Sequence, residues 1–193
     1  MNPTNDNAAP SALRTAVFID GAHLARILRA SYPDAWVGYD RLAAYVAGRG
    51  QLLRAYFYDA LPYLGRSATY AEREHYERRK RFFRVLGALP GFQVREGRCV
   101  QGEHGMMQKR VDVLLASDLV RLATKRAIDV AVVLTGDSDF VPAVEIAKDE
   151  GVRVRLVCSP DPHRTHQDLV AAVDERMVID QAMIESVRAE RAA

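Results

Sequence analysis

Residues 128–158 read IDVAVVLTGDSDFVPAVEIAKDEGVRVRLVC, and this stretch decides the fold. A β-branched run over 128–135 predicts a buried strand, a helical pattern follows over 138–150, and a second, valine-rich strand pattern covers 152–158. A strand, a helix and another strand of the same sheet are joined by a right-handed crossover, so the two strands run parallel. The segment therefore predicts a parallel sheet covered by helices.

The same alternation continues through most of the chain. Further strands are expected over residues 15–20, 52–59, 91–100 and 177–179, and further helices over 21–32, 37–48, 69–86, 111–125 and 165–173, with a glycine-containing loop over 101–108. The predicted fold class is α/β, a three-layer α/β/α sandwich with a mainly parallel central sheet.

The predicted domain organisation is one domain with a short tail at each end. Residues 1–14 lack any period and predict a flexible N-terminal tail, 15–181 form the domain, and 182–193 form a C-terminal helical tail. The apolar side of this last helix would either cap the sheet or join a homodimer.

Composition excludes several classes of protein. The 193 residues carry 27 Lys+Arg and 25 Asp+Glu, a net charge of +2, and 49% of them are hydrophobic, so disorder of the whole chain is excluded. The apolar stretch Val130–Leu134 is far shorter than the roughly 18 to 20 residues that span a bilayer. Without an apolar leader, a cytoplasmic location is the expectation. Cys99 and Cys158, the two cysteines, form neither a disulfide framework nor a zinc motif.

Aspartates follow two of the predicted strands. Asp20 ends the strand over 15–20, and Asp137 and Asp139 follow the strand over 128–135. Ligands of open parallel sheets bind beyond the carboxyl ends of the strands, so neighbouring strands would bring these carboxylates together, with Asp112 at a helix start as a fourth. Crowded carboxylates either raise their pKa values or bind a cation. All-oxygen ligation suits Mg²⁺ or Mn²⁺, which can activate water against a phosphodiester.

Each aspartate alone has a simpler interpretation. Asp-Gly after a strand is common in turns, and Asp137 or Ser138 could be the N-cap of the next helix. Four acids in this order favour the metal site over four separate caps.

At these residues the sequence resembles a known family. The segments FIDGAHL (18–24), KRVD (109–112) and TGDSDFVP (135–142) look like the NYN domain of the LabA-like group, within the PIN-like nucleases, and the resemblance covers about residues 14–181. It implies a PIN-like fold and a ribonuclease activity that depends on Mg²⁺ or Mn²⁺. The acids that it assigns as catalytic metal ligands are Asp20, Asp112, Asp137 and Asp139.

Other residues receive supporting roles. The family usually has Asn where this chain has His23, which could replace Asn as a neutral hydrogen-bonding group or become a cation near neutral pH. We expect His23, Lys109, Arg110 and Ser138 to contact the substrate. Asp118 matches a further family acid but lies six residues after Asp112, on another side of the helix, so we expect it to support Lys109 by a hydrogen bond or ion pair.

Basic and histidine-rich segments have two interpretations each. Arg73, Lys80 and Arg84 stand at helical spacing and could bind RNA phosphates, although a solvated helix face explains most of these charges. His163 and His166 have a metal-like spacing, but a helix start with Thr165 explains this region better.

Three functions follow from these observations. The first is a Mg²⁺- or Mn²⁺-dependent endoribonuclease that acts on single-stranded or structured RNA. The second, motivated by His23, is a non-catalytic RNA-binding or regulatory protein with a degenerate site. The third is a phosphatase-like hydrolase, which lacks the expected paired-aspartate motif because Asp20 is followed by Gly-Ala.

Overall fold

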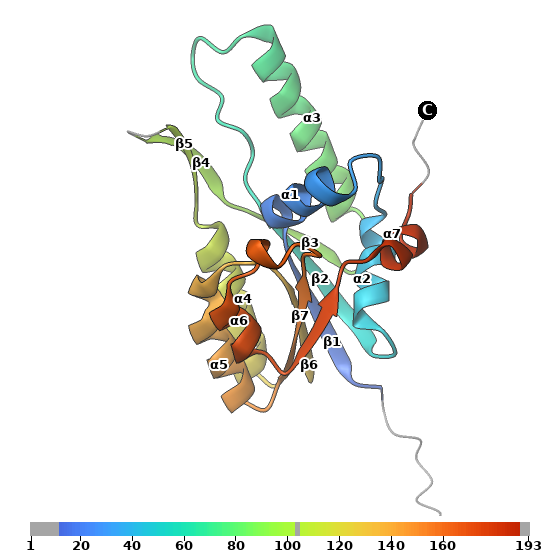
Figure 1. Cartoon of the computed structure of the whole chain (residues 1–193). Helices are drawn as coiled ribbons and strands as arrows, with labels where there is room; N and C mark the ends of the chain where they lie inside the picture. Colours follow the sequence, from blue (N-terminus) through green and yellow to red (C-terminus); the bar gives the residue numbers. More distant parts are fainter. Residues whose placement is uncertain (1–11, 103–104, 190–193) are drawn as a thin grey trace, which may run out of the picture.

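A computed structural model of the chain describes residues 12–102 and 105–189, and its centre is a six-stranded sheet (Figure 1). The strands run in the order β3-β2-β1-β6-β7-β8, and all neighbouring pairs are parallel. Their bounds are β1 (Arg14–Asp20), β2 (Gln51–Asp59), β3 (Phe92–Glu96), β6 (Val130–Leu134), β7 (Arg153–Cys158) and β8 (Glu175–Val178). The predicted parallel sheet is confirmed.

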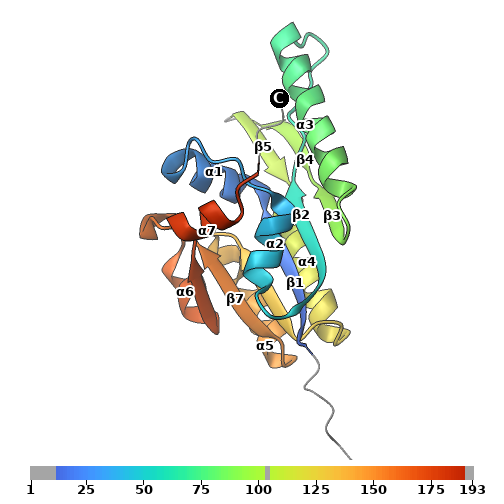
Figure 2. The ribbon, with the colours of Figure 1, turned by 90° about the vertical axis from the view of Figure 1, so that its right-hand side faces the viewer.

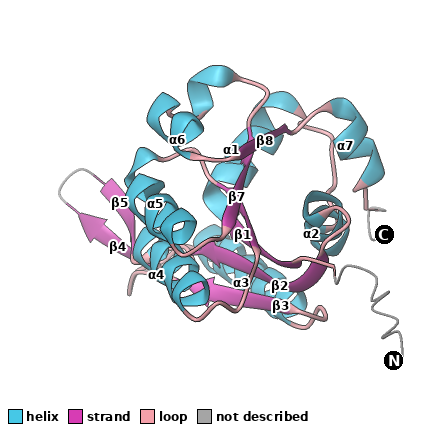
Figure 3. Cartoon of the chain, turned by 90° about the horizontal axis from the view of Figure 1, so that it is seen from below, coloured by secondary structure: helices cyan, strands magenta, loops and turns pink. Residues whose placement is uncertain are grey.

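Helices cover both faces of this sheet (Figure 3). They are α1 (Gly21–Ser31), α2 (Tyr39–Ala47), α3 (Tyr70–Gly87), α4 (Val111–Thr124), α5 (Val141–Asp149), α6 (Gln167–Ala172) and α7 (Gln181–Ser186), with short 3₁₀ turns η1 (Ser138–Phe140) and η2 (Pro162–Arg164). Alternate residues of β1 enter two separate cores: Val17 and Ile19 pack with α1, α2, α3 and α7, and Phe18 packs with α4, α5 and α6. This is the predicted three-layer α/β/α sandwich.

Local sequence signals explain where the long helix α3 begins. The Thr69 hydroxyl accepts a hydrogen bond from the Glu72 backbone N–H at 3.3 Å, and the Glu72 carboxylate accepts one from the Thr69 N–H at 2.7 Å. This capping box satisfies two N–H groups that the helix leaves unpaired. The first part of α3 projects beyond the carboxyl edge of the sheet (Figures 1 and 2).

One predicted strand and one predicted loop differ from the structure. The strand expected over 91–100 ends at Glu96, and β4 (Arg98–Gly102) pairs antiparallel with β5 (Gly105–Lys109) where a loop was expected. The chain turns at the buried Gly97, whose N–H donates to the Asp59 carbonyl at 2.9 Å. A side chain at Gly97 would collide with Val111, so glycine permits this sharp departure from the sheet.

The last helix belongs to the folded core. Met183, Ile184 and Val187 are buried in the same cluster as β1, and α7 packs against α2. The apolar side of α7 thus covers its own sheet, the first of the two predicted alternatives. Residues 1–11 and 190–193 of the predicted tails lie outside the described residues. In the described part of the chain, no helix combines the length and the apolar character needed to cross a bilayer.

Candidate active site

The candidate site lies where the strand order of the sheet reverses. β1 and β6 are parallel neighbours, with Ile19 opposite Leu134. After β1 the chain enters α1 on one face, and after β6 it enters η1 and α5 on the other. These departures to opposite faces open a crevice at the carboxyl edge, which is where ligands of such sheets bind. The predicted neighbourhood of the two aspartate-bearing strands is confirmed.

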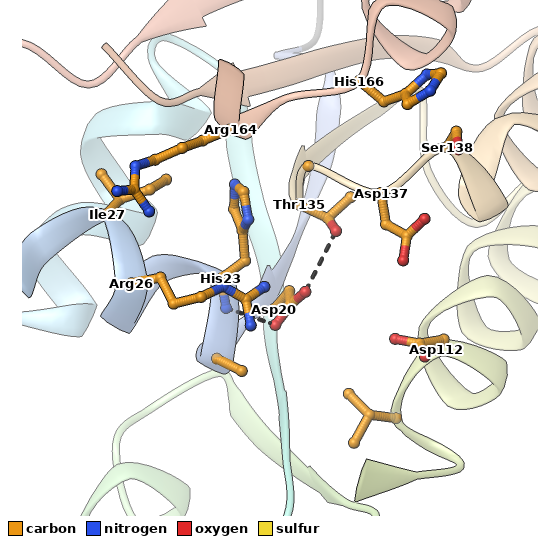
Figure 4. Close-up of a pocket in the computed structure, with 13 residues that line it drawn as sticks. Asp20, His23, Arg26, Ile27, Asp112, Thr135, Asp137, Ser138, Arg164 and His166 are labelled. Carbon is orange, nitrogen blue, oxygen red and sulfur yellow. Dashed lines mark hydrogen bonds between the residues drawn. The ribbon is translucent and has the colours of Figure 1, made fainter. Parts of the chain in front are cut away.

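A cavity of about 520 Å³ occupies this crevice (Figure 4). Five of the predicted site residues line it: Asp20, His23, Asp112, Asp137 and Ser138. They come from the end of β1, from α1, from the start of α4 and from the segment after β6, so distant parts of the chain meet at one site.

Asp20 is held in place by two hydrogen bonds. Its side chain accepts from the His23 backbone N–H at 2.9 Å, as the N-cap of α1, and from the Thr135 hydroxyl at 3.3 Å. The residue is only 8% exposed, and its burial raises the pKa of the carboxyl against the opposing effects of the His23 N–H and of Arg26. Asp20 is therefore a helix cap as well as a wall of the cavity.

Asp112 and Asp137 face the cavity from the opposite side and are exposed (Figure 4). Asp137 caps η1 by accepting from the Asp139 backbone N–H at 3.0 Å, so the capping alternative is correct for Asp137 too. Partial burial raises the pKa of Asp112, and the negative charges of Asp137 and Asp139 raise it further. Asp139 is exposed and does not line the cavity, although its charge acts on the site.

The carboxylate oxygens in the cavity are ligands of the type that Mg²⁺ and Mn²⁺ bind. Within residues 12–102 and 105–189, no three His, Cys, Asp or Glu side chains gather closely enough to hold a metal ion alone. Mg²⁺ keeps several waters and is commonly bound through one or two carboxylates together with substrate phosphates. Asp112 and Asp137, which are exposed and whose charges interact, match that mode of binding.

His23 is buried behind these carboxylates. Only 4% of the residue is exposed, and its Nε2 has no hydrogen-bond partner among the described residues. The pKa of His23 is lowered to about 4, first by burial and then by the nearby positive charges of Arg26 and Arg164, while Asp137 opposes them. The imidazole is therefore neutral at pH 7, which is the first of the two predicted alternatives.

Three other predicted residues lie away from the cavity. Lys109 and Arg110 are exposed, and Arg110 is the residue before α4, with a left-handed φ of 76°. Asp118 is buried on α4 and accepts hydrogen bonds from Tyr58 at 3.1 Å, Arg95 at 2.9 Å and Arg121 at 2.7 Å. The expectation that Asp118 supports Lys109 is wrong, because the register of α4 points Asp118 toward β2 and β3.

A segment from η2 to α6 closes one end of the cavity. The His166 N–H donates to the Gly136 carbonyl at 2.9 Å, and the His166 side chain caps α6 by accepting from the Asp168 N–H at 3.2 Å. The helix start was predicted, but its cap is His166 and not Thr165, which is buried with an unpaired hydroxyl among the described residues.

Gly136 is the position where this segment comes closest to the site. A Cβ there would lie closer to the Arg164 carbonyl and to the His23 ring than real Cβ atoms approach. We expect Gly136→Ala to lower the free energy of unfolding by roughly 1–3 kcal/mol, the usual cost of overpacking. Chemical denaturation checks this, with Gly87→Ala as a control because a Cβ there makes ordinary contact with Val94 at 3.7 Å. Equal stability of the two variants would contradict the tight packing at Gly136.

Sequence reasoning missed the cationic wall of the cavity. Arg26 and Arg164 line it on the side of α1 and η2 (Figure 4). Arg26 follows His23 by three residues, so the helical period could have placed the two on one face of α1. Arg164 lies far from Asp20 in the sequence, and no pattern in the residues around it predicts that it lines the cavity.

The fold and the site together define a class of protein: a parallel α/β/α domain with acidic residues at the carboxyl edge of its sheet. A family model, NYN domain, matches residues 14–180. The chain belongs to the NYN domain family.

Two further proteins are similar to the chain. The uncharacterized protein y4oD of Sinorhizobium fredii is 50% identical over 50 residues, which are 26% of this chain and 23% of that protein. A crystal structure of a protein of unknown function from Vibrio parahaemolyticus is 20% identical and has a TM-score of 0.66, and the match covers 90% of this chain and 97% of that one. This structure supports the fold alone.

Proposed function

We propose that the protein is an endoribonuclease that hydrolyses RNA phosphodiester bonds with the help of Mg²⁺ or Mn²⁺. The observation that carries the proposal is the cavity at the β1/β6 switch point, where Asp112 and Asp137 stand opposite Asp20, Arg26 and Arg164. Within the NYN family, we assign the chain to the LabA-like group on its Gly-Asp-Ser-Asp-Phe segment at 136–140.

Residues on the two sides of the cavity would have different roles, metal binding on one side and phosphate binding on the other. Asp112 and Asp137 would hold the divalent cation, with Asp20 and Asp139 adding negative charge. When bound, this cation lowers the pKa of a bound water and stabilises charge on the phosphate. Arg26 would bind a neighbouring phosphate of the substrate from the opposite wall, since its guanidinium carries a permanent charge with several donors. Ser138, half-buried in the cavity lining, would contribute a hydroxyl to the substrate.

His23 lines the cavity with an uncharged imidazole ring. Its backbone N–H fixes Asp20, and its ring packs beside Gly136. The ring thus fills the space beside Gly136, while the backbone N–H of the same residue holds Asp20 in place. We infer a positioning role for His23, in place of the Asn that the family usually has.

Metal binding can be tested before any substrate is known. Calorimetric titration with Mn²⁺ should give a saturable heat for the parent protein and no such heat for Asp112→Asn/Asp137→Asn. Asp149→Asn is a matched control, because this exposed residue ends α5 at the far edge of the sheet. Identical heats for the parent and the double variant would contradict the proposed metal site.

A non-catalytic RNA-binding protein is the second candidate, and the burial of His23 at the position of the usual Asn favours it. RNA cleavage with Mn²⁺ separates the two candidates. A parent protein that binds RNA without cleaving it, and a His23→Asn variant that gains measurable turnover, would support the non-catalytic function. Cleavage by the parent that EDTA abolishes, in a preparation free of host nuclease, would support the endoribonuclease.

A further inference from the structure

A second cavity of about 340 Å³ adjoins the active site. It is lined by Arg26 and Arg29 of α1, by His75 and Arg79 of α3, and by the loop after β2 that contains Pro62. We call it the α1–α3 groove. Its two α3 residues lie in the first half and at the middle of that helix, and the first part of α3 projects beyond the carboxyl edge of the sheet (Figures 1 and 2).

The groove carries a net positive charge. Among the described residues that line it, Asp59 alone is acidic, and Asp59 is 3% exposed and forms an ion pair with Arg79. The Arg79 guanidinium also lies over the ring of Phe82, 4.8 Å from the centroid, so Arg79 is fixed. Among the described side chains, neither Arg26 nor Arg29 lies within ion-pair distance of a carboxylate. Their charges are available to an anionic ligand.

The groove is continuous with the active site. Ala22 and Arg26 line both cavities, so one turn of α1 joins the carboxylate wall to the α1–α3 groove. Arg26 is close enough to Asp20 and Asp112 for its charge to lower the pKa of both. A ligand that reached the carboxylates could therefore extend past Arg26 to Arg29 without leaving the protein surface.

We propose that the α1–α3 groove binds the phosphates of the RNA strand next to the bond that is cleaved, with Arg26 and Arg29 as the contacts. This inference rests on the proposed function and specifies the path of the RNA strand across the protein surface. Arg26 would hold the phosphate nearest the site, and Arg29, one turn further along α1, the next one. An extended polyanion matches two free guanidinium groups on one helix face.

A nucleic acid fits this surface better than an acidic peptide. Mg²⁺ held by one or two carboxylates commonly binds substrate phosphates as well, so the cation proposed at Asp112 and Asp137 favours a phosphate at the active-site end of the groove. Tyr63, next to the groove residue Pro62, is 42% exposed, and exposed aromatic rings beside basic grooves stack on unpaired bases. Both features favour a single-stranded nucleic acid.

The test is equilibrium binding of a fluorescein-labelled oligouridylate, followed by anisotropy in EDTA at increasing salt. Arg29→Gln should weaken binding at low salt and make the plot of log affinity against log salt less steep by about 0.7, the value for one phosphate contact of a single strand. Arg49→Gln is the matched control, because Arg49 is exposed just before β2, at the opposite edge of the sheet. It should change neither quantity.

The outcomes separate the groove from the cleavage reaction. If the parent cleaves RNA and Arg29→Gln binds with unchanged affinity and salt slope, the groove proposal is wrong and the endoribonuclease stands. If the parent binds without cleaving and Arg29→Gln lowers the slope, the groove stands and the nuclease proposal fails. Displacement of the oligouridylate by polyglutamate at an equal charge concentration would overturn the choice of nucleic acid over acidic peptide.

Discussion

Asp137→Asn is expected to slow RNA cleavage at least about a hundredfold, because a metal site supplies several kcal/mol of charge stabilisation and each 1.36 kcal/mol is a factor of ten in rate. The fold should persist. Asp137 is exposed, and among the described residues its side chain accepts one hydrogen bond, from the Asp139 backbone N–H, which an Asn side-chain oxygen can also accept. The loss would therefore report on charge at the site.

The measurement is the rate of cleavage of a labelled RNA at saturating Mn²⁺, with thermal unfolding of each variant as a check on folding. Asp149→Asn, which changes the same group at the far edge of the sheet, should cleave at the parent rate. Retention of full activity by Asp137→Asn, in protein shown to be free of contaminating nuclease, would exclude the proposed site.

The sheet could be predicted because the local hydrophobic pattern of the sequence indicates each strand and each connecting helix. Buried parallel strands read as short apolar runs, and residues 130–134 follow that rule throughout, while in 153–158 only the last three residues form such a run. The order of the strands brought Asp20 and Asp137 to one edge, as expected. The β4–β5 hairpin was missed because its departure depends on the fit of Gly97 against Val111, a contact between separate elements that no periodicity reveals.

The acidic half of the site was predictable, whereas in the basic half only the position of Arg26 on α1 could have been predicted. Aspartates directly after strands have a position fixed by the sheet, so Asp20 and Asp137 could be placed from the sequence. The side-chain direction of Asp118 depends on the register of α4 against β2 and β3, and three partners other than Lys109 hold it. Arg164 reaches the cavity through a loop after β7, and loop paths are set by tertiary contacts such as the His166 bond to Gly136.

His23 should make the stability of the protein depend on pH between about 4 and 6.5. The pKa of the buried ring is about 4, against 6.5 in an exposed histidine, so between these values the unfolded chain binds a proton that the folded chain does not. The free energy of unfolding then falls as the pH drops from 6.5 toward 4, by about 3 kcal/mol for this group, and is flat outside that window. Asp20 and Asp112, whose pKa values are raised, act in the opposite direction as they take up protons.

The contribution of His23 is isolated by comparing slopes. Urea unfolding in EDTA at several pH values should give a free energy for the parent that loses about 3 kcal/mol more across this window than that of His23→Asn, whatever the stability of the variant at pH 7. His163→Gln removes an exposed histidine and should keep the parent slope.

A parallel pair of curves for the parent and His23→Asn would mean that the ring takes up its proton in the folded state, and a cation would then stand beside Asp20 at the back of the cavity. Such a cation would reduce the site's attraction for Mn²⁺, so the same result would predict metal binding that weakens below pH 6.5 in the parent and not in His23→Asn.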